Sequence, residues 1–282
     1  MIGIVTDSTC DIPSDLAQQH GITVVPQVLI WGEEQYRDRV DLQPGEFYQR
    51  LGADKVRPRT SLPGVYDFHA AYEQAASRGA RELLVITVSS TLSGTYDNAR
   101  QAAEAFSLPV TVLDSRGTSM GMGWQVLAAA RARDAGLDLR AVLDRVEVVR
   151  QRITQMVGLN TLEYLRKGGR IGAAARWATS LMRIKPLVGF NVLTNLVEPL
   201  GLARTYRALI DLLDRKFFDQ LKSKHNLRIA VLHGNALDEA QQLADRIREE
   251  FDPLELLVNS TGPVVGLHTG PGALGLCGYV DG

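Results

Sequence analysis

Short apolar runs alternate with longer stretches of helical periodicity through the first half of the chain. The runs are IGIV (2–5), ITVV (22–25), LLVITV (83–88) and VTVL (110–113). Between the last two, apolar residues recur at spacings of three and four, at Tyr96, Ala99, Ala103 and Phe106. This stripe indicates a helix that begins near Gly94. Strands that alternate with helices are typical of a largely parallel sheet with helices on both faces.

The pattern changes near residue 150. After a helix at 138–152, the stretch 189–204 resembles two strands joined by a tight turn around Thr194 and Asn195, which favours antiparallel pairing. A helix at 205–222, a strand at 227–232 and a helix at 237–251 follow. We therefore expect an α/β protein of two lobes. A Rossmann-like N-terminal domain spans 1–150, and a C-terminal mixed α/β domain spans 151–282.

Composition limits the partners that the chain can bind. Its 282 residues are 45% apolar and 22% charged, and the formal charge is −1 at pH 7, so no charge excess favours nucleic acid. No apolar stretch is long enough to span a bilayer, and the first residues do not resemble a signal peptide. We expect a cytoplasmic protein without an integral membrane segment. Cys10 and Cys277 are far apart in sequence, which fits reduced thiols.

Polar turns follow three of the predicted strands. They are TDST (6–9), SSTLSGT (89–95) and DSRGTS (114–119), each placed before a predicted helix. Ligands of open parallel sheets bind beyond the carboxyl ends of the strands, where helix N-termini attract negative charge. Serine, threonine and aspartate also cap helices, but one helix needs only one cap. The surplus of hydroxyls predicts a site for an anionic head group.

A serine nucleophile in this turn is the sharper alternative. Ser93 would need an adjacent base, and His268 is a candidate from the other lobe. The patterns G-x-S-x-G and S-x-x-K are both missing, as are the nucleotide-binding glycine loops, so we expect no cofactor. Asp7 and Asp11 could hold a metal. A role at the end of the strand and as caps of the helix near Pro13 is the simpler interpretation, and we predict no metal site.

Two segments of the second lobe also suit an anion. In LEYLRKGGRIG (162–172), glycines surround Arg170, so its guanidinium can project toward a carboxylate or phosphate. In HTGPGALG (268–275), His268 and Thr269 precede a turn rich in backbone donors.

Taken together and in order, these motifs resemble the DegV family of bacterial fatty-acid-binding proteins. The matching segments are TDSTCDIP (6–13), RTSLP (59–63), SSTLSGTY (89–96), LDSRGTSMGMG (113–123), LEYLRKGGRIG (162–172), IKPLV (184–188), ART (203–205) and HTGPGALG (268–275). The resemblance implies a two-lobed carrier of one long-chain fatty acid, with the carboxylate near the seam between the lobes and the tail in an apolar tunnel. It also implies an ATP-dependent fatty acid kinase subunit as partner, which forms an acyl phosphate for phospholipid synthesis.

The resemblance assigns roles to particular residues. Thr60 and Ser93 correspond to hydroxyl ligands of the carboxylate, and Gly94 offers its amide. His268 and Thr269 would join them, while Arg170 would meet the kinase or the acyl phosphate. The carrier would have no catalytic residue of its own. The rival interpretation is a stand-alone acyl- or phosphoryl-transfer enzyme that uses Ser93 and His268.

Overall fold

The chain folds into two compact units. The computed structural model describes residues 1–177, 184–191 and 194–282. The first unit contains Met1–Asp41 and Thr60–Gln151, and the second contains Leu42–Arg59 and Arg152–Gly282. The chain thus leaves the first unit for residues 42–59 and returns to it before the final change near residue 151.

A four-stranded parallel sheet forms the centre of the first unit. Its order is β2-β1-β6-β7. The strands are β1 (Ile2–Asp7), β2 (Thr23–Val25), β6 (Glu82–Thr87) and β7 (Val110–Asp114). The chain moves outward from β1 in one direction to β2 and in the other through β6 to β7. The carboxyl ends of β1 and β6 therefore meet where the strand order reverses.

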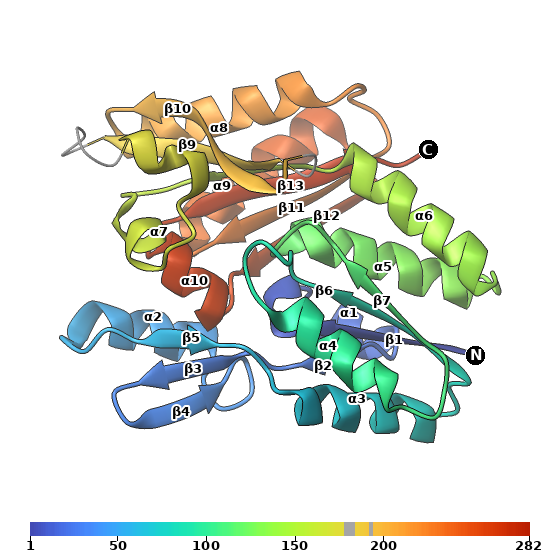
Figure 1. Ribbon diagram of the computed structural model, residues 1–282. Helices are drawn as coiled ribbons and strands as arrows, with labels where there is room; N and C mark the ends of the chain where they lie inside the picture. The colour runs from blue at the N-terminus through green and yellow to red at the C-terminus, as the bar shows by residue number, and fades with distance from the viewer. Residues whose placement is uncertain (178–183, 192–193) are drawn as a thin grey trace. The chain divides into compact units, whose positions relative to one another are not determined.

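Helices cover both faces of this sheet (Figure 1). One face packs on α3 (Val65–Ser77) and α4 (Thr95–Glu104) through a cluster that includes Val5, Val85 and Phe68. On the other face, α5 (Met120–Asp134) brings Met122 against Thr6 of β1. The unit also contains η1 (Ser8–Cys10), α1 (Ser14–Gln19) and α6 (Leu139–Arg152). The expected Rossmann-like arrangement is confirmed.

A small second sheet has the order β4-β3-β5. Its strands are β3 (Val28–Trp31), β4 (Glu34–Arg37) and β5 (Arg59–Ser61). β3 and β4 form an antiparallel hairpin, with Gly32 in the turn at a φ of 64° that favours glycine.

The second unit is built on a six-stranded mixed sheet of order β10-β9-β8-β13-β11-β12. All neighbouring strands are antiparallel except β11 and β12. The strands are β8 (Thr154–Gly158), β9 (Lys185–Asn191), β10 (Leu196–Ala203), β11 (Leu227–His233), β12 (Glu255–Ser260) and β13 (Leu274–Val280). The expected antiparallel pair is β9 with β10. Residues 192 and 193 of the predicted 189–204 stretch lie outside the described residues.

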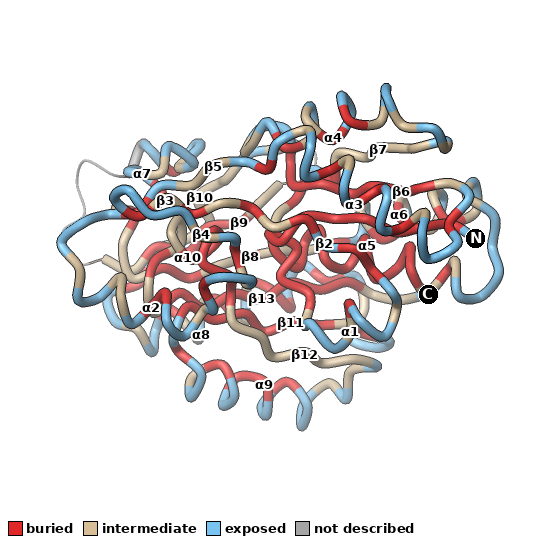
Figure 2. The backbone as a smooth tube through the Cα atoms, turned by 90° about the horizontal axis from the view of Figure 1, so that it is seen from below, coloured by how far each residue is buried: buried red, intermediate tan, exposed pale blue. Residues whose placement is uncertain are grey.

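Helices also cover this second sheet. They are α7 (Glu163–Lys167), η2 (Gly172–Trp177), α8 (Tyr206–Gln220), α9 (Leu237–Phe251) and α10 (Pro263–Thr269). Leu213 and Leu243, from α8 and α9, join Ile229 and Val231 of β11 in one apolar cluster. Figure 2 shows α9 buried along one side and exposed along the other. The C-terminal mixed α/β lobe is confirmed.

The segment 42–59 packs within the second unit through α2 (Pro44–Ala53). Phe47 and Tyr48 are buried, and the Tyr48 hydroxyl lies 2.6 Å from Thr261 Oγ1. A side chain at Gly266 would overlap the Tyr48 hydroxyl, so this glycine makes room for the ring. A division of the chain at one residue number cannot describe this excursion, because α2 packs against residues that are remote from it in the sequence.

Candidate functional site

The predicted anion-binding residues form two groups, one in each unit. Thr60, Ser93 and Gly94 belong to the first unit. Arg170, His268 and Thr269 belong to the second.

Thr60 and Ser93 lie on adjoining segments of the first unit. Thr60 is in β5, and Ser93 lies in the turn between β6 and α4. The Asn98 side chain in α4 donates a hydrogen bond of 2.8 Å to the carbonyl of Pro63, just beyond β5. Leu62 lies in van der Waals range of the position that a Cβ at Gly94 would occupy, at 3.8 Å. The structure thus brings together segments whose hydrogen-bonded residues are 35 positions apart in the sequence.

Most hydroxyls of the turn bond one another rather than cap α4. Ser90 donates to Asp114 at 2.6 Å, and Ser89 pairs with Thr91 at 2.9 Å. Ser93 Oγ lies 2.8 Å from Thr95 Oγ1. The N-cap of α4 is Gly94, which has no side chain to serve as a cap. Capping therefore does not account for this concentration of hydroxyls.

Gly94 itself has ordinary backbone geometry. Its φ is −71°, which any residue adopts, and a Cβ there would make only an ordinary contact. Neither backbone strain nor packing inside the first unit requires glycine at this position. Its expected role in the close approach of a ligand remains a prediction.

Asp7 joins the carboxyl ends of β1 and β6. It is fully buried and accepts hydrogen bonds from Thr9 N at 3.0 Å, from Thr9 Oγ1 and from Val88 N at 2.8 Å. Burial raises the pKa of the Asp7 carboxyl, and these hydrogen bonds oppose the rise. The expected position at a strand end is correct, and Asp7 caps the short helix η1.

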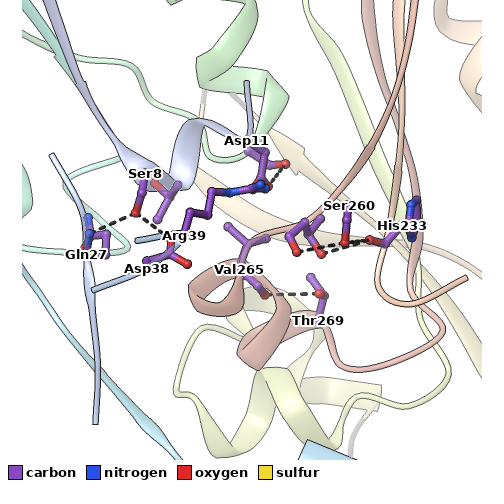
Figure 3. A network of polar contacts seen from close by, with 12 residues as sticks. Ser8, Asp11, Gln27, Asp38, Arg39, His233, Ser260, Val265 and Thr269 are labelled. Atoms are coloured by element: carbon purple, nitrogen blue, oxygen red, sulfur yellow. Dashed lines mark hydrogen bonds and ion pairs between the residues drawn. The ribbon is translucent and has the colours of Figure 1, made fainter. Parts of the chain in front are cut away.

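Two groups of polar contacts, around Ser8 and around Asp11, lie at the two ends of η1 (Figure 3). The Ser8 hydroxyl donates to Asp38 at 2.6 Å and accepts from the backbone N–H of Gln27 at 3.0 Å. Arg39 pairs with Asp11 at 2.7 Å, and Asp11 also accepts from Ser119 at 2.6 Å. The interpretation of Asp11 as the cap of α1 is therefore wrong, since its carboxylate is occupied by an arginine and a serine.

Gln27, Asp38 and Arg39 were not predicted from the sequence. Gln27 lies between the short strands β2 and β3, and Asp38 and Arg39 follow the short strand β4, so periodicity gives no signal for them. A polar residue between two apolar runs, as in VVPQVLI (24–30), is the one local hint that Gln27 is buried.

In the second unit, His268 and Thr269 end helix α10. A turn follows them at 271–272, as the sequence predicted, but His268 and Thr269 themselves lie at a helix C-terminus, where carbonyl groups form a negative pole. The Thr269 hydroxyl donates to the carbonyl of Val265 at 3.2 Å, as Figure 3 shows. The helix-end dipole alone would thus not attract an anion here.

The imidazole of His268 is held as a neutral group. It packs on Gly168, where a Cβ would overlap the ring, and its Nδ1 is buried without a hydrogen-bond partner among the described residues. Burial, assisted by the charge of Arg170, lowers the pKa of His268 to about 4. Arg170 is exposed and donates to the carbonyl of Gly168 at 2.6 Å.

These surroundings bear on the rival enzyme interpretation. Within the first unit, Ser93 Oγ bonds Thr95, a neutral group that cannot remove its proton. A general base works best when its pKa is near the operating pH, and that of His268 is well below neutrality. The local chemistry favours binding of an anion over activation of a nucleophile.

Other kinds of site receive little support from the described part of the chain. There, three or more His, Cys, Asp or Glu residues do not gather where a metal ion could be held. Cys10 and Cys277 are buried free thiols, and burial raises the pKa of Cys10 to about 12. Across residues 1–177, 184–191 and 194–282, the helices are too short or too polar to cross a bilayer.

Fold and site together define a two-unit α/β protein with neutral donors at the carboxyl end of a parallel sheet. The chain belongs to the DegV family, a family described as uncharacterised proteins, whose sequence profile matches residues 1–281. The resemblance found in the motifs is thereby confirmed.

Relatives match over nearly the whole chain. A DegV domain-containing protein of Halalkalibacterium halodurans is 32% identical over 281 residues, which cover 99% of each chain. A solved DegV family protein from Thermus thermophilus, described as showing fatty acid binding, is 32% identical with a TM-score of 0.90 and 99% coverage of both chains. A protein from Eubacterium ventriosum, described as binding stearic acid, is 26% identical with a TM-score of 0.90 and covers 99% of this chain and 98% of its own.

Proposed function

We propose that the protein binds one long-chain fatty acid and carries it without catalysing a reaction. Thr60, Ser93 and the amide of Gly94 bind the carboxylate. His268 and Thr269 are further proposed ligands of the head group, and the tail occupies an apolar tunnel. The observation that carries the proposal is the adjoining pair of hydroxyl segments in the first unit. A relative that is 32% identical over 99% of the chain and described as binding fatty acid supports it.

Neutral donors suit this ligand. Hydroxyl and amide groups stabilise a carboxylate without transferring a proton to it. They can bind the same head group after it becomes an acyl phosphate, which is also an acceptor. A strong base beside Ser93 would serve no purpose in such a site.

The tail would supply most of the affinity. Burial of each CH₂ contributes about 0.8 kcal/mol, so a chain of about sixteen carbons gains on the order of 10 kcal/mol before ordering costs. This gain is enough to sequester a fatty acid from water.

The carrier presents the bound acid to an ATP-dependent kinase subunit in the cytoplasm. Phosphorylation there yields the acyl phosphate for phospholipid synthesis. Arg170 is exposed beside His268, which supports a role in the kinase encounter or next to the new phosphate rather than as a primary carboxylate ligand.

Native mass spectrometry of protein purified from cells tests the carrier. We expect a fatty acid bound in near-equal amount and released by denaturing extraction. An empty protein that hydrolyses or transfers acyl esters would instead establish the enzyme that uses Ser93 and His268.

Substitution of the head-group residues tests the site. Ser93→Ala and Thr60→Ala should each weaken fatty acid binding by about 1–3 kcal/mol, because the carboxylate loses a donor. Ser90→Ala and Ser61→Ala are matched controls. Ser90 bonds Asp114, and Ser61 follows Thr60 on the opposite face of β5. The affinity for fatty acid, measured by calorimetry on delipidated protein, should fall in Ser93→Ala and Thr60→Ala and stay unchanged in the two controls. Equal affinity in all four variants would remove Thr60 and Ser93 from the site.

The phosphorylation step needs a separate test. The loaded protein is incubated with ATP and a bacterial fatty acid kinase subunit, and the acyl phosphate is sought by mass spectrometry. If the fatty acid is unchanged after incubation with an active kinase, the protein is a carrier whose ligand is not phosphorylated by this kinase.

A further inference from the structure

A line of hydrogen bonds runs from the interior of the first unit to Ser93. Gln27 and Thr95 are 3% and 0% exposed, whereas Ser93 is only partly buried. Gln27 Nε2 donates to Thr95 Oγ1 at 3.0 Å, and Thr95 Oγ1 lies 2.8 Å from Ser93 Oγ. The line therefore connects a buried amide to a hydroxyl at the proposed head-group site.

Asp7 fixes which end of the Gln27 amide faces inward. Backbone N–H groups, which can only donate, occupy both carboxylate oxygens of Asp7. The Gln27 side chain also helps to lower the pKa of the Asp7 carboxyl, as an N–H donor facing its charged form does. Because this carboxylate serves as an acceptor, the NH₂ group of Gln27 must face it. The second hydrogen of the same NH₂ group then reaches Thr95.

The direction of each later hydrogen bond follows from the first. A hydroxyl has a single hydrogen. Thr95 accepts from Gln27 and is fully buried, and among the described residues Ser93 Oγ is the other partner of its hydroxyl. Its own hydrogen would be buried without an acceptor unless it goes to Ser93 Oγ. Ser93 accepts this hydrogen and a longer contact of 3.4 Å from the backbone N–H of Thr95. The hydrogen of Ser93 is left to point away from the interior.

We propose that Gln27 and Thr95 are positioning residues that fix the Ser93 hydroxyl as a donor. The site then selects head groups that accept, such as a carboxylate or a phosphate, over head groups that can only donate, such as an alkylammonium. This inference rests on the proposed function, because it requires that Ser93 meet the head group. It adds a physical reason why the site favours an acid over a head group that can only donate.

The test compares two substitutions of Thr95 in the delipidated, full-length protein. Thr95→Val keeps the shape of the side chain but removes the hydroxyl, and Thr95→Ser keeps the hydroxyl. The probes are hexadecanoate and hexadecanol, whose tails are the same length. The alcohol can donate or accept, so it reports on tail binding. Thr95→Val should lower the affinity for hexadecanoate about tenfold and change that for hexadecanol less than about twofold. Thr95→Ser should resemble the parent protein for both.

A pH titration separates orientation from packing. The carboxyl group of bound ¹³C-labelled hexadecanoate is followed by NMR. A tenfold loss of preference for the charged form corresponds to a rise of about one unit in the pKa of the bound acid. We expect this rise in Thr95→Val, and we expect the pKa in Thr95→Ser to stay at the value of the parent protein.

Several results would overturn the inference. Equal loss of acid and alcohol binding in Thr95→Val would assign Thr95 to packing, and unchanged acid binding would show that Ser93 needs no orientation. If Thr95→Val does not fold, Gln27→Met is measured with the same probes, because it removes the amide hydrogens at similar length. Parent protein that binds neither probe would reject the proposed function itself, which is a different result.

Discussion

The ring of His268 lies in surroundings that disfavour its charged form. Burial and Arg170 lower the pKa of His268 to about 4 in the folded chain, against 6.5 for an ordinary histidine. Between these values the unfolded chain binds a proton that the folded chain does not. The free energy of unfolding therefore does not change with the protonation of His268 above about pH 6.5, and it falls as the pH drops from 6.5 toward 4.

The pH dependence of unfolding can isolate this histidine. From pH 7 to pH 4, His268 should remove roughly 2–3 kcal/mol from the free energy of unfolding. His268→Gln should lose this part of the pH dependence, as measured by urea denaturation at a series of pH values. His225→Gln, at an exposed histidine, is the control and should keep the slope of the parent protein. Parallel curves for His268→Gln and the parent would contradict the lowered pKa.

Single residues also show what could be foreseen of the site. Ser93 was recognisable because it belongs to a run of hydroxyls behind an apolar strand, and that run has a local signature. Gln27 was not, because its importance depends on Asp7 and Thr95, which are 20 and 68 residues away in sequence. A contact between distant residues leaves no trace in either local pattern.

At the scale of elements, the apolar stripe of the amphipathic helices was visible in the sequence and α5 showed none, although a helix was expected after DSRGTS (114–119). α4 and α9 have one apolar face, so their periodicity is visible in the sequence. In α5 the residues Met120–Ala130 are all buried, so there is no polar face to define a stripe. The hairpin of β3 and β4 was missed, because its strands have only four residues each.

Glycines in two helices should respond in opposite ways to alanine. A Cβ at Gly123 in α5 would lie 2.6 Å from the carbonyl oxygen of Cys10, which cannot move easily. Gly123→Ala should therefore lower the free energy of unfolding by about 1–3 kcal/mol, despite the better helix propensity of alanine. Gly52→Ala in α2 has open space and should raise it by up to ~1 kcal/mol. Chemical denaturation of both variants checks the signs, and a stable Gly123→Ala would mean that α5 shifts without cost.

At the scale of the whole molecule, the fold class followed from the order of strands and helices. Parallel pairing in the first unit and mixed pairing in the second were both indicated by the change of pattern near residue 150. The excursion of residues 42–59 into the second unit was not indicated by the sequence, because α2 has an ordinary helical sequence. Its membership of the second unit is decided by Phe47 and Tyr48, which fill space beside residues more than 200 positions away.

Tyr48 should report on this long-range packing. Thr261 donates to the carbonyl of His233, so the Tyr48 hydroxyl donates to Thr261. Tyr48→Phe should cost about 1 kcal/mol of stability, and Tyr48→Ala about 3–5 kcal/mol. Tyr66→Phe, at a side chain that is 90% exposed, should cost nothing. Differential scanning calorimetry of the full chain measures all three. A Tyr48→Ala protein as stable as the parent would exclude an anchoring role for α2.

The excursion of residues 42–59 has a consequence for inheritance. Neither unit corresponds to one continuous stretch of coding DNA, because each is assembled from two separated stretches. A recombination event that transplanted residues 152–282 alone would leave behind the helix that carries Phe47 and Tyr48. Descendants of an ancestral gene are therefore expected to keep both parts together and to diverge by substitution rather than by shuffling of modules.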